Sequence, residues 1–88
     1  MPKSLFEEAI QRFSPTQRQA VAALLAGTPD LWERMKVVCR TLGISYGDVA
    51  RATDLDYRRV ERIMNLRARP TGEEILRITT VLGVQVDD

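Results

Sequence analysis

Histidine is absent from the sequence, and cysteine occurs only once. An intrachain disulfide is therefore impossible, and so is a zinc finger, which needs about four Cys or His ligands. Histidine-based acid–base catalysis and a Ser-His-Asp triad are excluded as well. The five glycines are spread singly, so there is no glycine-rich phosphate loop. With no nucleophile–base pair and no metal-ligand cluster in the sequence, we predict that the chain is not an enzyme and uses no cofactor or metal.

Long apolar runs are also missing from the sequence. No segment approaches the roughly 20 consecutive apolar residues that a membrane span needs. The N-terminal segment carries two glutamates where a signal peptide would be apolar. The 88 residues are 44% hydrophobic and 28% charged, which is typical of one small domain with a single core. We therefore expect a cytoplasmic protein with no membrane association.

The sequence has almost no net charge, since its formal charge is only +1. The distribution of charge is more informative than the sum. Five arginines and a single acidic residue lie between residues 57 and 70, whereas the C-terminus ends in two aspartates. This pattern predicts one locally basic surface on a nearly neutral chain.

Apolar residues recur with helical periodicity along most of the chain, and each periodic stretch has its own start and stop signals. The predicted helices span residues 4–13, 15–26, 29–42, 46–53, 57–66 and 72–82. Their expected N-terminal caps are Ser14, Thr28, Ser45, Asp56 and Thr71. Alternation typical of a strand occurs only at 84–86. The pattern therefore predicts an all-α fold, a compact helical bundle.

Apolar stripes indicate which side of each helix is buried. Val21, Leu24 and Leu25 form the expected buried face of the second predicted helix. Trp32 and Cys39 fall in the apolar stripe of the third, where core packing is the expected role rather than stacking or redox chemistry.

The segment 44–63 has the organisation of a helix-turn-helix: a short helix, a turn of about three residues and a second helix. Its apolar positions agree with that geometry. Those expected to meet in one small core are Val49, Ala50, Leu55, Val60 and Ile63. Alanine at position 50 is small enough to let the two helices cross closely.

At these positions the sequence resembles the Xre/Cro-repressor family of helix-turn-helix proteins, over roughly residues 31–84. The shared features are Ile44-Ser45, Val49-Ala50, Leu55, Val60-x-Arg62-Ile63, Pro70 and Leu82-Gly83-Val84. Three positions differ from the family, which usually has Gln where Tyr46 stands and Gly where Asp54 and Leu66 stand. Aspartate tolerates the left-handed conformation better than most residues, so the turn at 54 is expected to form. The family's fifth helix is expected to be missing here.

The resemblance implies that the helix at 57–66 enters the major groove of double-stranded DNA with its N-terminal side chains at base edges. Because the buried residues of this helix face inward, Arg58 and Arg62 point outward one turn apart, and Arg59 is expected beside them. The predicted base-reading residues are Tyr57, Arg58, Arg59, Glu61 and Arg62. Glu61 either accepts a hydrogen bond from cytosine or holds Arg58 in place.

Phosphate contacts position a DNA-binding protein without reading sequence. The residues expected to make them are Ser45, Tyr46, Arg67 and Arg69. For Tyr46 a second role stays open, because the side chain could simply pack at the start of its helix.

Two extra N-terminal helices precede the helix-turn-helix. We predict an N-terminal extension at 1–28 and a DNA-binding domain at 29–88. The apolar faces of the extension consist of Leu5, Phe6, Ile10, Phe13, Val21, Leu24 and Leu25. They either replace the missing fifth helix in the core or form a dimer interface, and of the two we expect a homodimer, as paired half-sites on DNA require. The residues predicted for a dimer interface are Leu5, Phe6, Ile10, Phe13 and Leu24.

The leading prediction is a sequence-specific transcriptional regulator that acts as a repressor, since nothing in the sequence indicates an activation or ligand domain. The alternative is an antitoxin-like or adaptor protein. In that case the N-terminal helices would bind a protein partner and DNA binding would be secondary.

Overall fold

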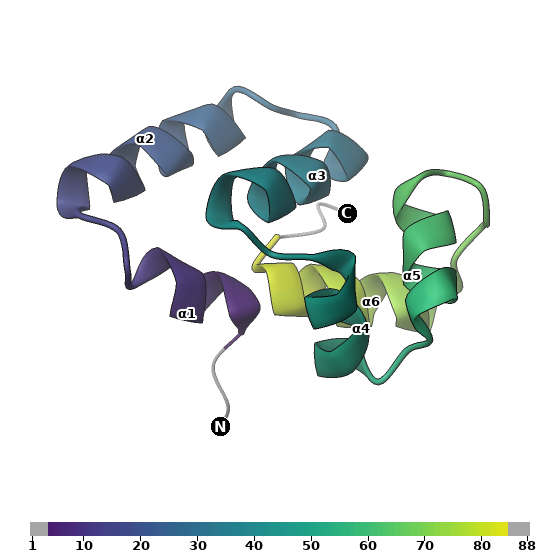
Figure 1. Cartoon of the computed structure of the whole chain (residues 1–88). Helices are drawn as coiled ribbons and strands as arrows, with labels where there is room; N and C mark the ends of the chain where they lie inside the picture. The colour runs from purple at the N-terminus through teal and green to yellow at the C-terminus, as the bar shows by residue number, and fades with distance from the viewer. Residues whose placement is uncertain (1–3, 85–88) are drawn as a thin grey trace.

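The computed structural model of the chain describes residues 4–84, which form six α-helices and no strand (Figure 1). The helices are α1 (Leu5–Ile10), α2 (Pro15–Ala26), α3 (Leu31–Leu42), α4 (Tyr46–Thr53), α5 (Tyr57–Met64) and α6 (Gly72–Leu82). The predicted all-α fold, with a helix-turn-helix preceded by two further helices, is confirmed. The strand-like alternation at 84–86 lies almost wholly outside the described residues. Within 4–84, no helix combines the length and the apolar character needed to cross a membrane.

Capping boxes begin three of the helices, as the sequence predicted at Ser14 and Thr71. At Ser14, Ser45 and Thr71 the cap hydroxyl accepts from the amide three residues later, and that later side chain accepts from the amide of the cap. These bonds satisfy amides that a helix N-terminus leaves without partners. The starts of α2, α4 and α6 therefore follow from interactions within four residues of sequence.

The start of α3 differs from the prediction. The cap is Asp30, not Thr28, and its carboxylate accepts from the amide of Glu33 at 3.0 Å. The hydroxyl of Thr28 instead donates to the carbonyl of Leu24 at 2.8 Å, at the end of α2. Thr28 therefore closes the preceding helix, and α3 begins two residues later than predicted.

Two helices also end earlier than predicted. α1 ends at Ile10 rather than 13, and the amide of Phe13 donates to the Ile10 carbonyl in a tighter turn. Helical geometry is disfavoured just before Pro15, so the chain leaves the helix before it reaches Ser14. α5 ends at Met64 rather than 66, because Leu66 has a left-handed backbone.

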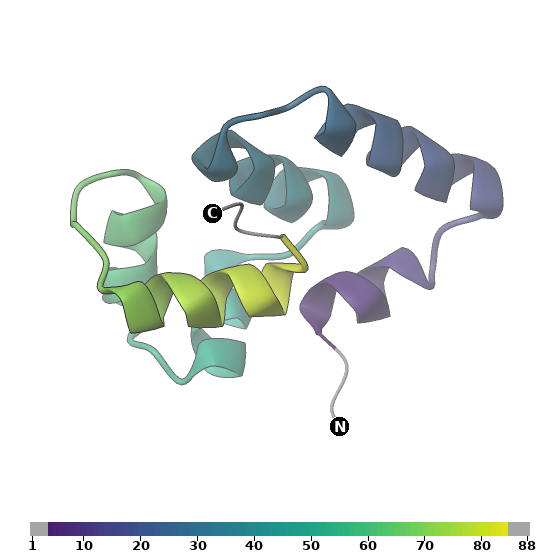
Figure 2. The same cartoon turned by 180° about the vertical axis from the view of Figure 1, so that it is seen from behind.

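The core lies between α3, α4, α5 and α6, and Figure 2 shows α6 lying across one side of the molecule, in front of the other helices. The largest fully buried hydrophobic side chains are Met35, Ile63, Met64, Ile78, Leu82, Val38, Val49 and Val60. The small helix-turn-helix core predicted from the sequence is confirmed, with Leu55 half-buried against it. Cys39 is buried as expected, and burial raises the pKa of its thiol to about 11, so the thiol stays protonated at neutral pH.

The N-terminal helices pack on this core. α1 contacts α3 and α6, and α2 contacts α3. Leu5, Phe6, Ile10 and Phe13 are half-buried against the core of their own chain. Val21 and Leu25 face inward as predicted, but the expectation that α2 also buries Leu24 was wrong, since that side chain is 48% exposed. The apolar face of α1 thus completes the core.

Candidate nucleic-acid interface

The two helices of the motif are α4 and α5, which pack against each other and are joined by a tight turn. Asp54 ends α4 with a φ of 59°, the left-handed conformation expected for it. The amide of Leu55 then donates to the carbonyl of Ala50 at 3.1 Å, which turns the chain back across α4. Ala50 is buried where the helices cross, in agreement with the requirement for a small residue there.

α5 presents a basic face to solvent. Its cap is Asp56, whose carboxylate accepts from the amide of Arg58 at 3.1 Å. Val60 and Ile63 are completely buried and hold the inner face of the helix. On the outer face Arg58 and Arg62 are exposed, as expected. Tyr57, at the N-terminal end of the helix, is 49% exposed.

Arg59 lies differently from the other two arginines of α5. Its Nε and Nη2 donate to the two carboxylate oxygens of Glu74, each at 2.8 Å, and Nη2 also donates to the carbonyl of Arg69 at 3.1 Å. The guanidinium is therefore directed toward α6 and the loop before it. We had expected Arg59 on the free face because Val60 and Ile63 are buried. The sequence pattern does not indicate its partner, Glu74, which is 15 residues away.

Glu61 is half-buried on α5. Within residues 4–84 no ion pair joins it to Arg58, although the two stand at i, i+3 spacing. The structure therefore shows no ion pair through which Glu61 would hold Arg58 among the described residues. Its other predicted role, accepting a hydrogen bond from cytosine, stays a prediction.

The predicted phosphate-binding residues occupy two places. Arg67 and Arg69 are exposed in the loop between α5 and α6. Ser45 begins α4, where its hydroxyl accepts from the amide of Asp48 and its own amide donates to the Asp48 carboxylate, both at 3.0 Å. The cap thus already uses both of these groups of Ser45, while Tyr46 remains directed away from the cap.

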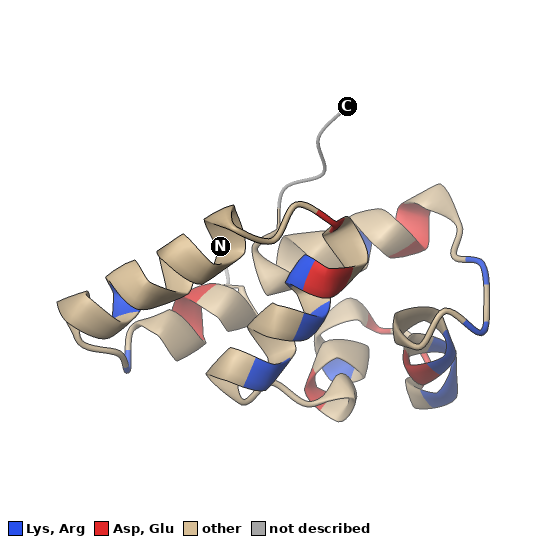
Figure 3. Ribbon diagram, turned by 90° about the horizontal axis from the view of Figure 1, so that it is seen from above, with Lys and Arg blue, Asp and Glu red and all other residues tan. Residues whose placement is uncertain are grey.

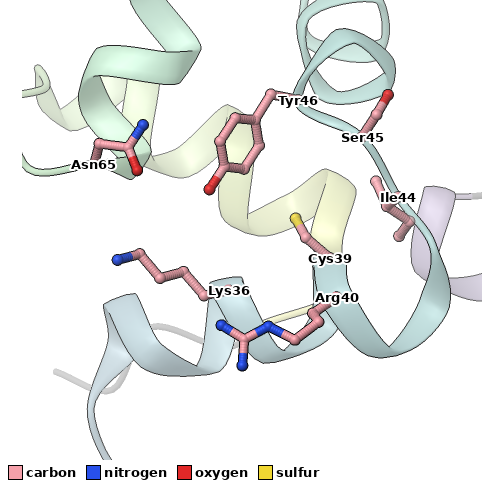
Figure 4. Close-up of a pocket in the computed structure, with 7 residues that line it drawn as sticks. All are labelled: Lys36, Cys39, Arg40, Ile44, Ser45, Tyr46 and Asn65. Carbon is pink, nitrogen blue, oxygen red and sulfur yellow. The ribbon is translucent and has the colours of Figure 1, made fainter.

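Tyr46 faces a hollow of about 430 Å³ between α3, the start of α4 and the end of α5 (Figure 4). Burial raises the pKa of the Tyr46 phenol, so its hydroxyl is a hydrogen-bond donor at neutral pH. Lys36 and Arg40, one turn apart on α3, and Asn65, just after α5, line the same hollow. None of these three residues was predicted from the sequence to bind DNA. The spacing of the two cations on the polar side of α3 was the only signal for them.

Most of the basic residues that the structure describes lie on the helix-turn-helix part of the chain, from α3 onward. Lys and Arg lie along α5, in the loop that follows it and on α3, while α2 carries a single basic residue (Figure 3). The formal charge of +1 hides this segregation. A locally basic surface around an exposed helix is what binding to a nucleic-acid backbone requires.

A short helix, a tight turn and a second helix that crosses the first and exposes a basic face define a helix-turn-helix DNA-binding domain. The family model of the Cro/C1-type HTH DNA-binding domain matches residues 31–88, and the chain belongs to this family. The resemblance found in the sequence is thereby confirmed. None of the curated proteins and none of the solved structures compared with the chain is significantly similar to it. The family consists of DNA-binding domains and is typically not enzymatic.

Proposed function

We propose that the chain is a sequence-specific transcriptional regulator that inserts α5 into the major groove of double-stranded DNA. One observation carries the proposal: the outer face of α5 exposes Tyr57, Arg58 and Arg62, while the opposite face is completely buried. A rigidly held helix with free arginines is suited to bidentate contacts with guanine. Repression is the proposed mode of action, since occupancy of a site near a promoter is enough to block transcription.

The contacts divide into two groups in this proposal. Tyr57, Arg58 and Arg62 read bases, and Glu61 accepts from a cytosine amino group at the edge of the same face. The residues that contact the phosphate backbone of the DNA are Tyr46, Arg67, Arg69, Lys36 and Arg40. Ser45 contributes by starting α4 and so directing Tyr46 toward the phosphates.

Two chains bind one site in the proposed complex, with half-sites about 34 Å apart. Four of the five apolar residues first assigned to the dimer interface already pack within their own chain. The surface left for a second copy includes α2, where Leu24 is 48% exposed. The same exposed residue is what favours the alternative function, in which the N-terminal helices bind a different protein.

The function is tested by replacing arginines on a selected operator and on its single-base variants. Arg58→Ala or Arg62→Ala should cost about 1–3 kcal/mol on the operator and relax preference at one base pair. Arg69→Ala should weaken binding to all sequences alike and lower the salt slope by about one. Both effects follow from which part of the DNA each side chain reaches.

The matched control is Arg12→Ala, which removes the same exposed charge near the end of α1, far from α5 (Figure 1). It should leave both affinity and specificity unchanged, and circular dichroism should show that all variants remain folded. Folded variants at 58 and 62 that keep full discrimination between operator and variants would refute the assignment of α5.

A further inference from the structure

A single guanidinium connects three parts of the DNA-binding domain. Arg59 stands on α5, its carboxylate partner Glu74 on α6, and its third acceptor, the carbonyl of Arg69, in the loop between them. Arginine–carboxylate pairs with two parallel hydrogen bonds are stronger and more specific in geometry than single contacts. The Arg59 side chain is 37% exposed and that of Glu74 only 15%, so the pair is partly shielded from water.

Glu74 both pairs with Arg59 and takes part in the N-terminal cap of α6. Its Oε1 accepts from Arg59 and also from the amide of Thr71 at 2.8 Å, which closes the capping box of α6. The hydrogen bonds from Arg59, followed by that from Thr71, lower the pKa of Glu74 to about 2. The carboxylate is therefore ionised throughout the neutral range. The Glu74 carboxylate thus links Arg59 on α5 to the start of α6.

The loop at 65–71 is held along its length by this arrangement. At its beginning the amide of Arg67 donates to the carbonyl of Arg62 at 2.7 Å. In the middle the carbonyl of Arg69 accepts from Arg59, and at the end Thr71 is tied to Glu74. The side chains of Arg67 and Arg69 remain exposed. A loop ordered before binding loses less conformational entropy when its arginines meet a ligand.

We propose that Arg59 is a positioning residue that reads no base and instead holds the loop 65–71 in the conformation that presents Arg67 and Arg69 to the DNA backbone. This deepens the proposed function and rests on it. The competing role is base reading, for which Arg59 would have to leave Glu74. That movement would leave the half-buried carboxylate of Glu74 without its two hydrogen bonds from Arg59, which is costly. Arg58 and Arg62 can reach bases without breaking such a pair.

The test compares Arg59→Ala, Glu74→Gln and the double variant on the selected operator and its single-base variants. Each single change should weaken binding on the order of tenfold, and the double variant should be no weaker than the worse single one, because both remove the same contact. All sequences should be affected alike, with a lower salt slope. Arg58→Ala provides the contrast, since it should relax preference at one base pair.

A second readout needs no DNA. Trp32, the only tryptophan, lines a hollow together with Leu66 and Pro70 of the loop. Loosening of the loop in Arg59→Ala or Glu74→Gln should raise the access of acrylamide to Trp32 in the free protein, and Arg58→Ala should not.

The outcomes separate the two proposals. If Arg59→Ala relaxes preference at one base pair while Glu74→Gln does not, and Trp32 is unchanged in both, Arg59 reads a base and the positioning role is refuted. If the unmodified protein selects no DNA sequence, the proposed function fails. The fluorescence of Trp32 then still decides whether Arg59 holds the loop.

Discussion

At the scale of single residues, two non-glycine residues have left-handed backbones at positions where the family resemblance led us to expect glycine. Asp54 has a φ of 59° and Leu66 a φ of 58°. Aspartate visits this region because its short polar side chain can bond locally, whereas a leucine Cβ crowds the following carbonyl at a cost of about 1–2 kcal/mol. Leu66 is 62% exposed, so burial offsets little of this strain.

We therefore predict that Leu66→Gly stabilises the protein. Relief of the strain should exceed the extra entropy that glycine gives the unfolded chain, for a net gain of about 0.5–1 kcal/mol in the free energy of unfolding. Urea denaturation measures the change, and Asp54→Gly is the matched control, for which a smaller gain is expected. If Leu66→Gly made the protein less stable, packing of the Leu66 side chain in the hollow beside Trp32 would stabilise the fold by more than the backbone strain costs.

At the scale of elements, the packing of α1 on the end of α6 depends on a missing side chain. Gly83 ends α6 with a φ of 67°, and a Cβ placed there would come within 2.8 Å of the Phe6 side chain. Gly43 ends α3 with almost the same backbone, φ 70°, but a Cβ there would meet nothing within 4 Å. The two glycines thus share one conformational requirement, and only Gly83 adds a requirement for space.

This pair of glycines gives a test of how α1 is docked. Gly43→Ala should cost about 1 kcal/mol from backbone strain alone. Gly83→Ala should cost measurably more, because Phe6 must also shift. In a Phe6→Ala background the excess cost at 83 should disappear, since the two changes are coupled through one contact.

Thermal or urea denaturation of the four variants supplies the comparison. Equal costs at 43 and 83 would show that α1 does not rest on the end of α6. The apolar residues of α1 would then be free to bind another molecule.

At the scale of the whole molecule, the charge is unevenly distributed and the least charged helix is the most exposed. α2 carries Arg18 as its only charged residue, and that guanidinium is bonded to the carbonyls of Ile10 and Gln11. The rest of the outer surface of α2 is uncharged and includes Leu24. The basic face of α5 and this neutral helix would suit the two partners that we propose, DNA and a second copy of the chain.

We predict that two chains occupy one operator and that Leu24→Asp disrupts this pairing. Sedimentation of the complex should give two chains per site for the unmodified protein, and the variant should lose affinity for the full site while keeping its affinity for a half-site. The control is Leu76→Asp, which changes an exposed leucine on a different helix, α6. It should not change the affinity for the full site. A single chain bound at operator saturation would contradict the dimer.

The sequence by itself determined the helices, most of their caps, the small core of the helix-turn-helix and the family. These features depend on hydrogen bonds and apolar contacts between residues a few positions apart, as at Ser14, Ser45 and Asp54. The errors at Thr28 and at the ends of α1 and α5 were local too, and each shifted a boundary by two or three residues.

Only the tertiary structure decided the direction of Arg59, because a long charged side chain turns toward whichever partner the fold brings near, and Glu74 comes from another helix. The same reason applies to Lys36 and Arg40, which line one hollow with Tyr46 only because the fold brings α3 near the start of α4. It also applies to Phe6, since an amphipathic helix has an apolar face whether it covers its own core or a partner. The choice depends on whether the rest of the chain leaves a place for it, here the bare backbone at Gly83.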